Sequence, residues 1–329
     1  MKNFWKQRRV LLTGANGFLA GWLAKDLIQQ GAKLTGLVYE KNPVSVFETD
    51  QLKKKSEVIY SDILDFESIK RFIKDHHIQT IFHLGAQAIC KVAMENPVAT
   101  LDINIRGTIN ILEAVRVVDP TISVIVASSD KAYGTHKTLP YHEDFSLHGE
   151  FPYEVSKSCA DLISQMYFRT YGIPVSIVRS GNLYGGGDAH FSRVFPNTIH
   201  RMYQGLPPIL FNNSIRDYLY VEDAAMGYRL IGENMHQKKV AGEAFNIGWG
   251  KPISVLKVFT MIASAMDKPH LKPTQTKDQF PEIPSQYLAS TKIKKTLGWA
   301  PGIPLKEGIK RTVDWYVKYF STHKVDLTD

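Results

Sequence analysis

The chain has 329 residues, 44% of them hydrophobic, which is enough to bury the core of one large or two modest domains. Its two cysteines, Cys90 and Cys159, exclude a disulfide framework and a zinc cluster, indicate a reducing compartment and leave no metal site to expect. The net charge of +8 is spread along the chain rather than gathered in a basic stripe, so we expect no nucleic-acid partner.

The first predicted element is a buried strand over Val10–Thr13, followed by a glycine-rich turn and a helix over Leu19–Gln29. Strand, glycine turn and helix in this order form the phosphate-binding unit of dinucleotide-binding domains. One glycine makes the tight turn, a second lets the backbone approach a pyrophosphate at the helix N-terminus, and Ala20 takes the close-packing position. The residues expected to contact a cofactor here are Gly14, Asn16, Gly17, Phe18 and Leu19.

No apolar segment of the chain reaches the ~18 residues that a membrane helix needs. The basic residues ahead of Val10 precede a strand and a glycine turn, not the cleavage site of a secretory leader. We therefore expect a cytoplasmic protein with no membrane contact.

Short apolar strands alternate with amphipathic helices from Val10 to about Arg179. This alternation predicts an α/β fold of the Rossmann type, a doubly wound parallel sheet with helices on both faces. Further strands are expected at Lys33–Val38, Glu57–Tyr60, Thr80–Leu84, Ser123–Ser128 and Val175–Val178. Further helices are expected at Phe66–Lys74, Pro97–Val118 and Tyr153–Tyr171.

The alternating pattern loosens after Gly181, where glycine and proline become frequent. We therefore assign residues 1–180 to the dinucleotide-binding domain. Residues 181–329 are assigned mainly to a smaller, irregular α/β domain that binds the substrate. Residues 218–235 are expected to return to the first domain.

Acidic residues follow the second and third predicted strands. An acid at the end of the second strand accepts hydrogen bonds from the adenosine ribose and repels a 2′-phosphate, so Glu40 favours NAD over NADP. Lys41 beside it weakens this preference. Asp62 and Ile63, after the third strand, are placed to meet the adenine ring.

A tyrosine and a lysine stand four residues apart at the start of a predicted helix, as Tyr153 and Lys157. This spacing places both side chains on one helix face. A lysine held near a phenol and a nicotinamide ribose can lower the pKa of the phenol from its ordinary value of ~10. The phenolate can then take the proton of a sugar hydroxyl. By itself this pair is a weak signal, but it follows a complete dinucleotide-binding pattern.

Taken together, the motifs resemble the extended short-chain dehydrogenase/reductase family, which acts on nucleotide-sugars, over nearly the whole chain. The segments that carry the resemblance are Thr13–Phe18, His83–Gln87, Asn104 with Gly107-Thr108, Ser128–Gly134, Tyr153–Lys157, Arg179–Gly185, Arg216–Asp223 and Leu297–Pro301.

The resemblance assigns roles to single residues. It implies that Tyr153 and Lys157 are catalytic and also contact the NAD cofactor, as do Leu84 and Ala86. Ser129 is implied to be catalytic and to hydrogen-bond the sugar hydroxyl that is oxidised. The residues implied to bind the substrate are Gln87, Ser129, Asn182, Arg193 and Arg216, the last three through its phosphates. A homodimer that pairs two long helices across a two-fold axis is also implied.

The adjacent pair Asp130-Lys131 separates two activities within this family. A 4-epimerase oxidises C4 and returns the hydride, and needs no acid–base pair beyond the tyrosine. A 4,6-dehydratase must also remove the C5 proton and expel the C6 hydroxyl as water. The pair Asp-Lys resembles that of the CDP-glucose 4,6-dehydratase branch, in which Asp130 would protonate the departing hydroxyl. Lys131 would take the C5 proton or stabilise the charge, and a lysine base needs burial or a neighbouring cation.

Two departures from that branch leave the nucleobase open. The insert between Lys131 and Tyr153 is shorter than usual, and the loop expected to contact the base, Lys277–Glu282, lacks the common Arg-Pro-Gly. We interpret the chain as an NAD-dependent nucleotide-sugar 4,6-dehydratase with CDP-glucose as the favoured substrate. The alternatives are a nucleotide-sugar 4-epimerase and, more remotely, a non-catalytic dinucleotide-sensing protein.

Overall fold

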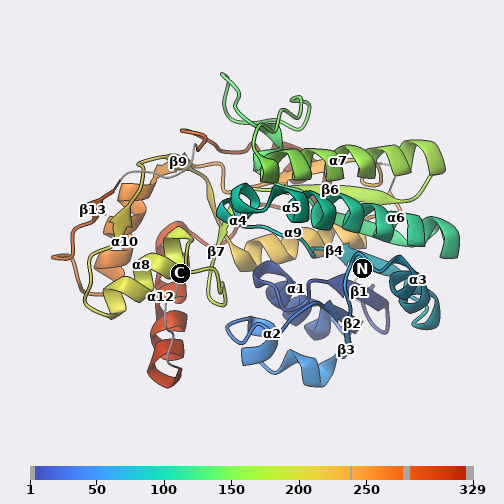
Figure 1. Ribbon diagram of the computed structural model, residues 1–329, viewed down its shortest axis with the longest axis horizontal. Coiled ribbons are helices and arrows are strands. Elements are labelled where there is room, and N and C mark those ends of the chain that lie inside the picture. Colours follow the sequence, from blue (N-terminus) through green and yellow to red (C-terminus); the bar gives the residue numbers. More distant parts are fainter. Residues whose placement is uncertain (1–3, 238, 277–281, 324–329) are drawn as a thin grey trace.

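A computed structural model describes residues 4–237, 239–276 and 282–323 of the chain (Figure 1). Within these residues seven strands form one sheet in the order β3-β2-β1-β4-β5-β6-β11, with every neighbouring pair parallel. These strands are β1 (Arg9–Thr13), β2 (Lys33–Val38), β3 (Glu57–Tyr60), β4 (Thr80–His83), β5 (Ser123–Ala127), β6 (Val175–Ser180) and β11 (Ala244–Ile247).

The central strands are apolar on both sides because helices cover both faces of the sheet. Leu11 of β1 lies opposite Thr35 of β2 and Ile81 of β4, and all three side chains are buried. The α/β fold with a doubly wound parallel sheet is thus confirmed. The strands β2 and β3 have the predicted bounds, whereas β6 extends to Ser180, beyond its predicted end.

Helices cover both faces of the sheet (Figure 1), and a hydrophobic core lies on each face. On one face, helix α1 (Phe18–Gln29) packs against α9 (Val221–Glu233), and their buried residues share one core with the sheet. On the other face, the second core joins helices α3 (Phe66–Asp75), α6 (Gly107–Val118) and α7 (Pro152–Tyr171). The two layers hold the carboxyl ends of the strands in a fixed array.

The helix predicted over Pro97–Val118 is interrupted. It consists of α5 (Pro97–Leu101), a π-helical turn (Asp102–Arg106) and α6. Such turns insert one extra residue into a helix and often lie at functional sites. Here the turn carries Asn104, a buried side chain that the motif analysis singled out.

A third core lies beside the sheet, around helices α8 (Val194–Tyr203), α10 (Val255–Ala265) and α12 (Leu305–Thr322) (Figure 1). The segment after residue 180 therefore builds a separate layer, but from this segment α9 also packs on the sheet and β11 is one of its strands. The assignment of residues 218–235 to the first domain stays a prediction, and the strand β11 in the sheet was not predicted. The division of the chain at residue 180 stays a prediction.

Shorter elements connect these layers. They are α2 (Val46–Thr49), a 3₁₀ turn (Leu52–Lys55), α4 (Cys90–Glu95), a 3₁₀ turn (Asp130–Tyr133), β7 (Asn182–Tyr184), β8 (Ile209–Leu210), β9 (Ile215–Arg216), β10 (Tyr218–Tyr220), β12 (Ile253–Ser254), β13 (Thr274–Gln275) and α11 (Thr291–Leu297). Among the described residues, none of the helices combines the length and the apolar character that a membrane span requires.

Candidate active site

The turn after β1 is shaped for close approach of a ligand's phosphates. Gly14 has a φ of +66°, and a Cβ built on it would lie 2.8 Å from Gly85 Cα. A Cβ on Gly17 would lie 3.0 Å from the Gly14 carbonyl oxygen. Both positions therefore favour glycine. Helix α1 begins at Phe18 with no side-chain cap, so its first N–H groups remain available to a phosphate.

A buried hydrogen-bond chain holds this turn against the end of β4. The Thr13 hydroxyl oxygen lies 2.9 Å from His83 Nδ1 and accepts hydrogen bonds from the N–H groups of Leu84 and Gly85. His83 Nε2 lies 3.1 Å from the Thr108 hydroxyl. Burial, together with the charge of Lys157, lowers the pKa of His83 to about 3. The imidazole therefore stays neutral and acts as a structural link.

The residues predicted to meet the adenosine lie around the same edge of the sheet. The Asn16 amide donates a hydrogen bond to the Glu40 carbonyl, which joins the glycine turn to the end of β2. Asp62 accepts from the Leu64 N–H, and Ile63 packs so closely on Gly107 that a Cβ there would lie 2.9 Å from it. The cofactor contacts of Glu40, Asp62, Ile63, Leu84 and Ala86 stay predictions.

Tyr153 and Lys157 lie one turn apart at the start of α7. Lys157 is buried, its ammonium donates to the Ala127 carbonyl at 2.9 Å, and burial lowers its pKa to about 8. Burial raises the pKa of Tyr153 above its ordinary value, although a hydrogen bond with Ser129 and the charge of Arg193 oppose the shift. The lowered phenol pKa expected from Lys157 is thus not found, because burial dominates.

The short turn after β5 carries the pair that distinguishes the two activities. The Ser129 hydroxyl accepts from the Lys131 N–H and donates to Asp130 Oδ1, both at 3.1 Å. Asp130 is only 3% exposed, and among the described residues its Oδ2 has no hydrogen-bond partner. Burial raises the pKa of Asp130 to about 6, against the charges of Lys131 and Arg216. A carboxyl with a raised pKa and a free oxygen is suited to donate a proton.

Asn104 in the π-helical turn connects the segment after β4 to α7, the helix that carries Tyr153 and Lys157. Its amide exchanges hydrogen bonds of 2.9 Å with the backbone of Gln87 and donates to the Ser156 hydroxyl at 2.8 Å. The Gln87 side chain itself bonds the Ile89 backbone. Its predicted contact with substrate stays a prediction.

The residues predicted to bind the substrate's phosphates converge from separate segments. Asn182 begins β7, and its buried Nδ2 has no hydrogen-bond partner among the described residues. Arg193, before α8, pairs with Asp188 at 3.1 Å and lies near Tyr153, whose pKa it influences. Arg216 in β9 is 3% exposed. These donors can bind an anion, as the resemblance implies.

Two residues of this site have neighbours that the sequence does not predict: Cys90, and Glu282, which was expected only as part of the loop that contacts the nucleobase. Glu282 forms an ion pair of 2.6 Å with Arg216 and lies 3.7 Å from the Lys131 ammonium. Cys90, an exposed residue at the start of α4, lies near the charges of Lys131 and Glu282. Nothing in the sequence around Glu282 reveals its partners. The Lys131 side chain is thus largely buried and lies near a carboxylate.

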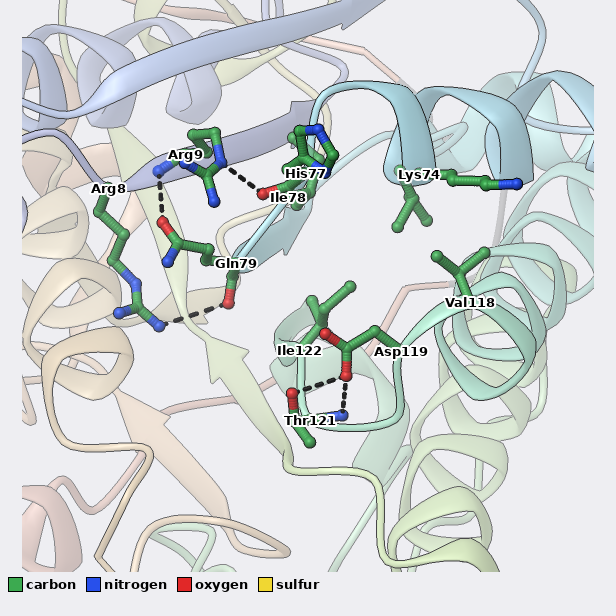
Figure 2. A pocket seen from close by; sticks show the side chains of 11 residues that line it. Arg8, Arg9, Lys74, His77, Ile78, Gln79, Val118, Asp119, Thr121 and Ile122 are labelled. Atoms are coloured by element: carbon green, nitrogen blue, oxygen red, sulfur yellow. Dashed lines mark hydrogen bonds between the residues drawn. The ribbon is translucent and has the colours of Figure 1, made fainter.

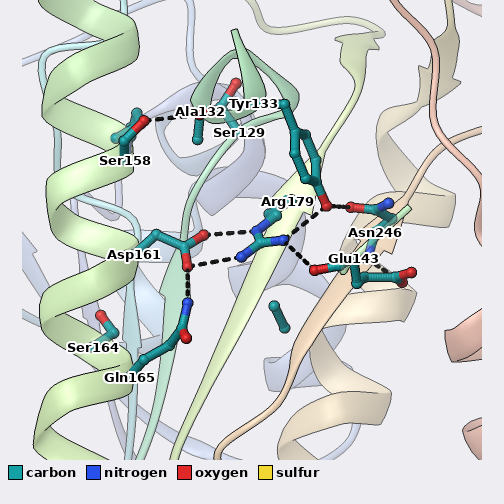
Figure 3. A network of polar contacts seen from close by, with 12 residues as sticks. Ser129, Ala132, Tyr133, Glu143, Ser158, Asp161, Ser164, Gln165, Arg179 and Asn246 are labelled. Carbon is teal, nitrogen blue, oxygen red and sulfur yellow. Dashed lines mark hydrogen bonds and ion pairs between the residues drawn. The ribbon is translucent and has the colours of Figure 1, made fainter. Parts of the chain in front are cut away.

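A polar network behind the site fixes the geometry of the catalytic turn (Figure 3). Arg179 of β6 forms a two-pronged ion pair with Asp161 of α7, at 2.8 and 3.0 Å, and donates to the Tyr133 hydroxyl. The Ser158 hydroxyl of α7 donates to the Ala132 carbonyl at 2.8 Å. Helix α7 and the turn that carries Asp130 are therefore held as one unit.

A cavity of about 610 Å³ lies at the amino-terminal ends of the strands, opposite the candidate site (Figure 2). Arg8, Arg9 and His77 line it together with Lys74 and Asp119. Arg9 begins β1 and His77 precedes β4, whereas ligands of open α/β sheets bind beyond the carboxyl ends of the strands. None of the predicted site residues lies in this cavity.

Comparison with known proteins agrees with this geometry. Residues 11–312 match the family described as GDP-mannose 4,6 dehydratase. The chain belongs to this family. Its resemblance to the nucleotide-sugar enzymes of the extended short-chain dehydrogenase/reductase family is thereby confirmed.

Some of the individual relatives are dehydratases and others are epimerases. The chain is 29% identical to a CDP-glucose 4,6-dehydratase of Salmonella typhimurium, over 96% of the chain and 92% of the relative. It is 28% identical to a UDP-glucuronate 4-epimerase of Thermodesulfobacterium geofontis, over 93% and 95%. A Thermus thermophilus UDP-glucose 4-epimerase solved with NAD superimposes with a TM-score of 0.84 at 26% identity, over 94% and 99%.

Proposed function

We propose that this protein is an NAD-dependent nucleotide-sugar 4,6-dehydratase. The observation that carries the proposal is Asp130, a buried carboxyl beside Ser129 whose pKa is raised to about 6. An epimerase needs no second proton donor next to its tyrosine, whereas expulsion of a hydroxyl as water does. The identity to the Salmonella typhimurium dehydratase supports the same choice.

The residues of this chain divide the reaction between them. Tyr153 takes the proton of the C4 hydroxyl, with Ser129 as its hydrogen-bond partner and Lys157 in the next helical turn. Asp130 donates a proton to the departing C6 hydroxyl. Lys131 stabilises the negative charge that forms when the C5 proton leaves, or accepts that proton itself. Asn182, Arg193 and Arg216 hold the diphosphate.

The dinucleotide site fits NAD in its shape. At Gly14 and Gly17 a side chain would collide with backbone, and helix α1 offers its uncapped N-terminus. When bound, NAD supplies the hydride acceptor and donor of the reaction. The Thermus thermophilus epimerase, which was solved with NAD, supports this choice of cofactor.

Glu40 is expected to make the enzyme prefer NAD. A 2′-phosphate near the Glu40 carboxylate would meet a repulsion of about 1 kcal/mol, which is about fivefold in Kd. Calorimetric titration should show tighter binding of NAD than of NADP. Glu40→Gln should reduce the difference between the two Kd values. The exposed Glu67→Gln on α3 is the control. Tighter NADP binding by the wild type would contradict the role of Glu40.

The proposed activity is tested by the product of the wild-type enzyme. A dehydratase converts its substrate into a 4-keto-6-deoxy sugar nucleotide that is lighter by one water. In deuterated water, C5 of that product should carry solvent deuterium. Mass spectrometry after incubation with CDP-, UDP-, GDP- and dTDP-hexoses measures both properties. A product of unchanged mass with inverted C4 would establish a 4-epimerase instead.

CDP-glucose is the substrate that we favour within this panel. The pair Asp130-Lys131 and the identity to the Salmonella typhimurium CDP-glucose 4,6-dehydratase support it. Residues 277–281 of the loop expected to contact the nucleobase lie outside the described residues. If the enzyme preferred a hexose nucleotide with another base, that base would replace cytosine in this proposal. The proposed reaction type would stay the same.

We further propose a homodimer formed through helices α6 and α7. Apolar side chains are exposed on these helices and on α5, namely Val98, Ile109, Val117, Leu162 and Met166. Leu162→Glu should place a charge within this face and produce a monomer. Light scattering after size exclusion measures the mass, with the exposed Leu256→Glu on α10 as the control. An unchanged dimer in Leu162→Glu would contradict this interface.

A further inference from the structure

The Arg216 guanidinium pairs with an anion from the protein itself. Its Nη2 lies 2.6 Å from Glu282 Oε1, while its Nη1 donates to the Ile215 carbonyl at 2.8 Å. The second oxygen of Glu282 accepts from the Asn212 amide at 2.8 Å. The carboxylate is therefore held on both sides, and its Oε1 also lies 3.7 Å from the Lys131 ammonium.

The two partners of this ion pair differ in exposure. The Arg216 side chain is 3% exposed, whereas that of Glu282 is 38% exposed. A buried cation without a counter-ion is costly, so the free protein needs an anion at this place. Burial alone would raise the pKa of Glu282, but Arg216 and Lys131 lower it below its ordinary value. Glu282 is thus ionised at neutral pH and neutralises Arg216.

We propose that Glu282 occupies the diphosphate subsite of the free enzyme as a built-in anionic competitor, which the substrate's diphosphate displaces from Arg216. This inference rests on the proposed function, which assigns Arg216 to the diphosphate. A carboxylate and a diphosphate cannot both stay close to one guanidinium without repelling each other. Breaking the Arg216–Glu282 ion pair therefore offsets part of the binding free energy between Arg216 and the substrate. In this way Glu282 lowers the affinity for nucleotide-sugars.

Substitution of Glu282 by glutamine tests whether the carboxylate competes with the substrate for Arg216 or only orients Arg216. Glu282→Gln removes the charge and keeps the shape, so Arg216 is left free for the diphosphate and nucleoside diphosphates should bind about tenfold more tightly. The free variant should also melt at a lower temperature than the wild type, because Arg216 loses its counter-ion. Its rise in melting temperature on addition of CDP should be larger than that of the wild type.

Calorimetric titration with CDP and UDP measures the affinity without any turnover. In an Arg216→Ala background, Glu282→Gln should bring no gain, since the group that both anions share is absent. Glu222→Gln is the matched control, because Glu222 pairs with Arg311 at 3.6 Å on the surface. Its affinity for CDP should equal that of the wild type.

Unchanged or weaker CDP binding by Glu282→Gln would overturn the inference and would show that the carboxylate only orients Arg216. A gain that persists in the Arg216→Ala background would overturn it as well. These results are independent of the reaction type, because the mass of the wild-type product alone decides whether the enzyme is a dehydratase. Failure of the inference and failure of the proposed function can therefore be told apart.

Discussion

Replacement of Asp130 by asparagine is expected to stop the loss of water while leaving the oxidation of C4 possible. The amide keeps the size of the side chain but cannot donate the proton that the departing C6 hydroxyl requires. Loss of a general acid of this kind lowers the rate by about 10²–10⁴-fold. Because the first half of the reaction continues, reduced cofactor should accumulate at its absorbance band when the variant meets its substrate.

The same residue predicts the pH dependence of the wild type. Burial raises the pKa of Asp130 to about 6, so the proton that it must donate is present below that pH and lost above it. We therefore expect kcat/KM for water loss to fall as the pH rises through about 6. Stopped-flow absorbance and product mass, measured across pH, check both expectations.

The control for this variant is Asp75→Asn, at the exposed end of α3. It should retain wild-type turnover. If Asp130→Asn released the dehydrated product at near wild-type rate, Asp130 would be a structural residue of the turn. The proposed dehydratase mechanism would then need another acid.

Replacement of Tyr153 by phenylalanine is expected to abolish turnover at the first step. The ring still packs at the start of α7, but no group remains to take the C4 hydroxyl proton, and the expected loss is about 10²–10⁴-fold. Burial raises the pKa of Tyr153, and its hydrogen bond with Ser129 and the charge of Arg193 oppose that shift. No reduced cofactor should accumulate, in contrast to Asp130→Asn.

Cofactor binding should survive this substitution, because the phosphate-binding turn after β1 is remote from the phenol in the chain and unchanged. Calorimetric titration with NAD and single-turnover absorbance measure the two properties separately. Tyr60→Phe, on an exposed tyrosine of β3, is the control. Near wild-type turnover of Tyr153→Phe would remove Tyr153 from the catalytic role.

The parallel sheet and the phosphate-binding turn could be predicted because their signals are local. Buried parallel strands are apolar runs, and the turn after Thr13 needs glycine wherever a side chain would collide with backbone. The spacing of Tyr153 and Lys157 places them on one helix face without reference to the rest of the fold. The π-helical turn at Asn104 and the strand β11 escaped prediction, since tertiary packing produces them.

The sequence by itself determined the fold class, the family and the residues with a motif: the glycine turn, Ser129 with Asp130 and Lys131, and the pair Tyr153 and Lys157. Only the tertiary structure decided which charges face one another. It brought Glu282 from a loop near the end of the chain to Arg216 and Lys131. It also buried Asp130 enough to raise its pKa to about 6. Such contacts join segments far apart in the sequence, and their energies depend on burial and distance, which no local pattern encodes.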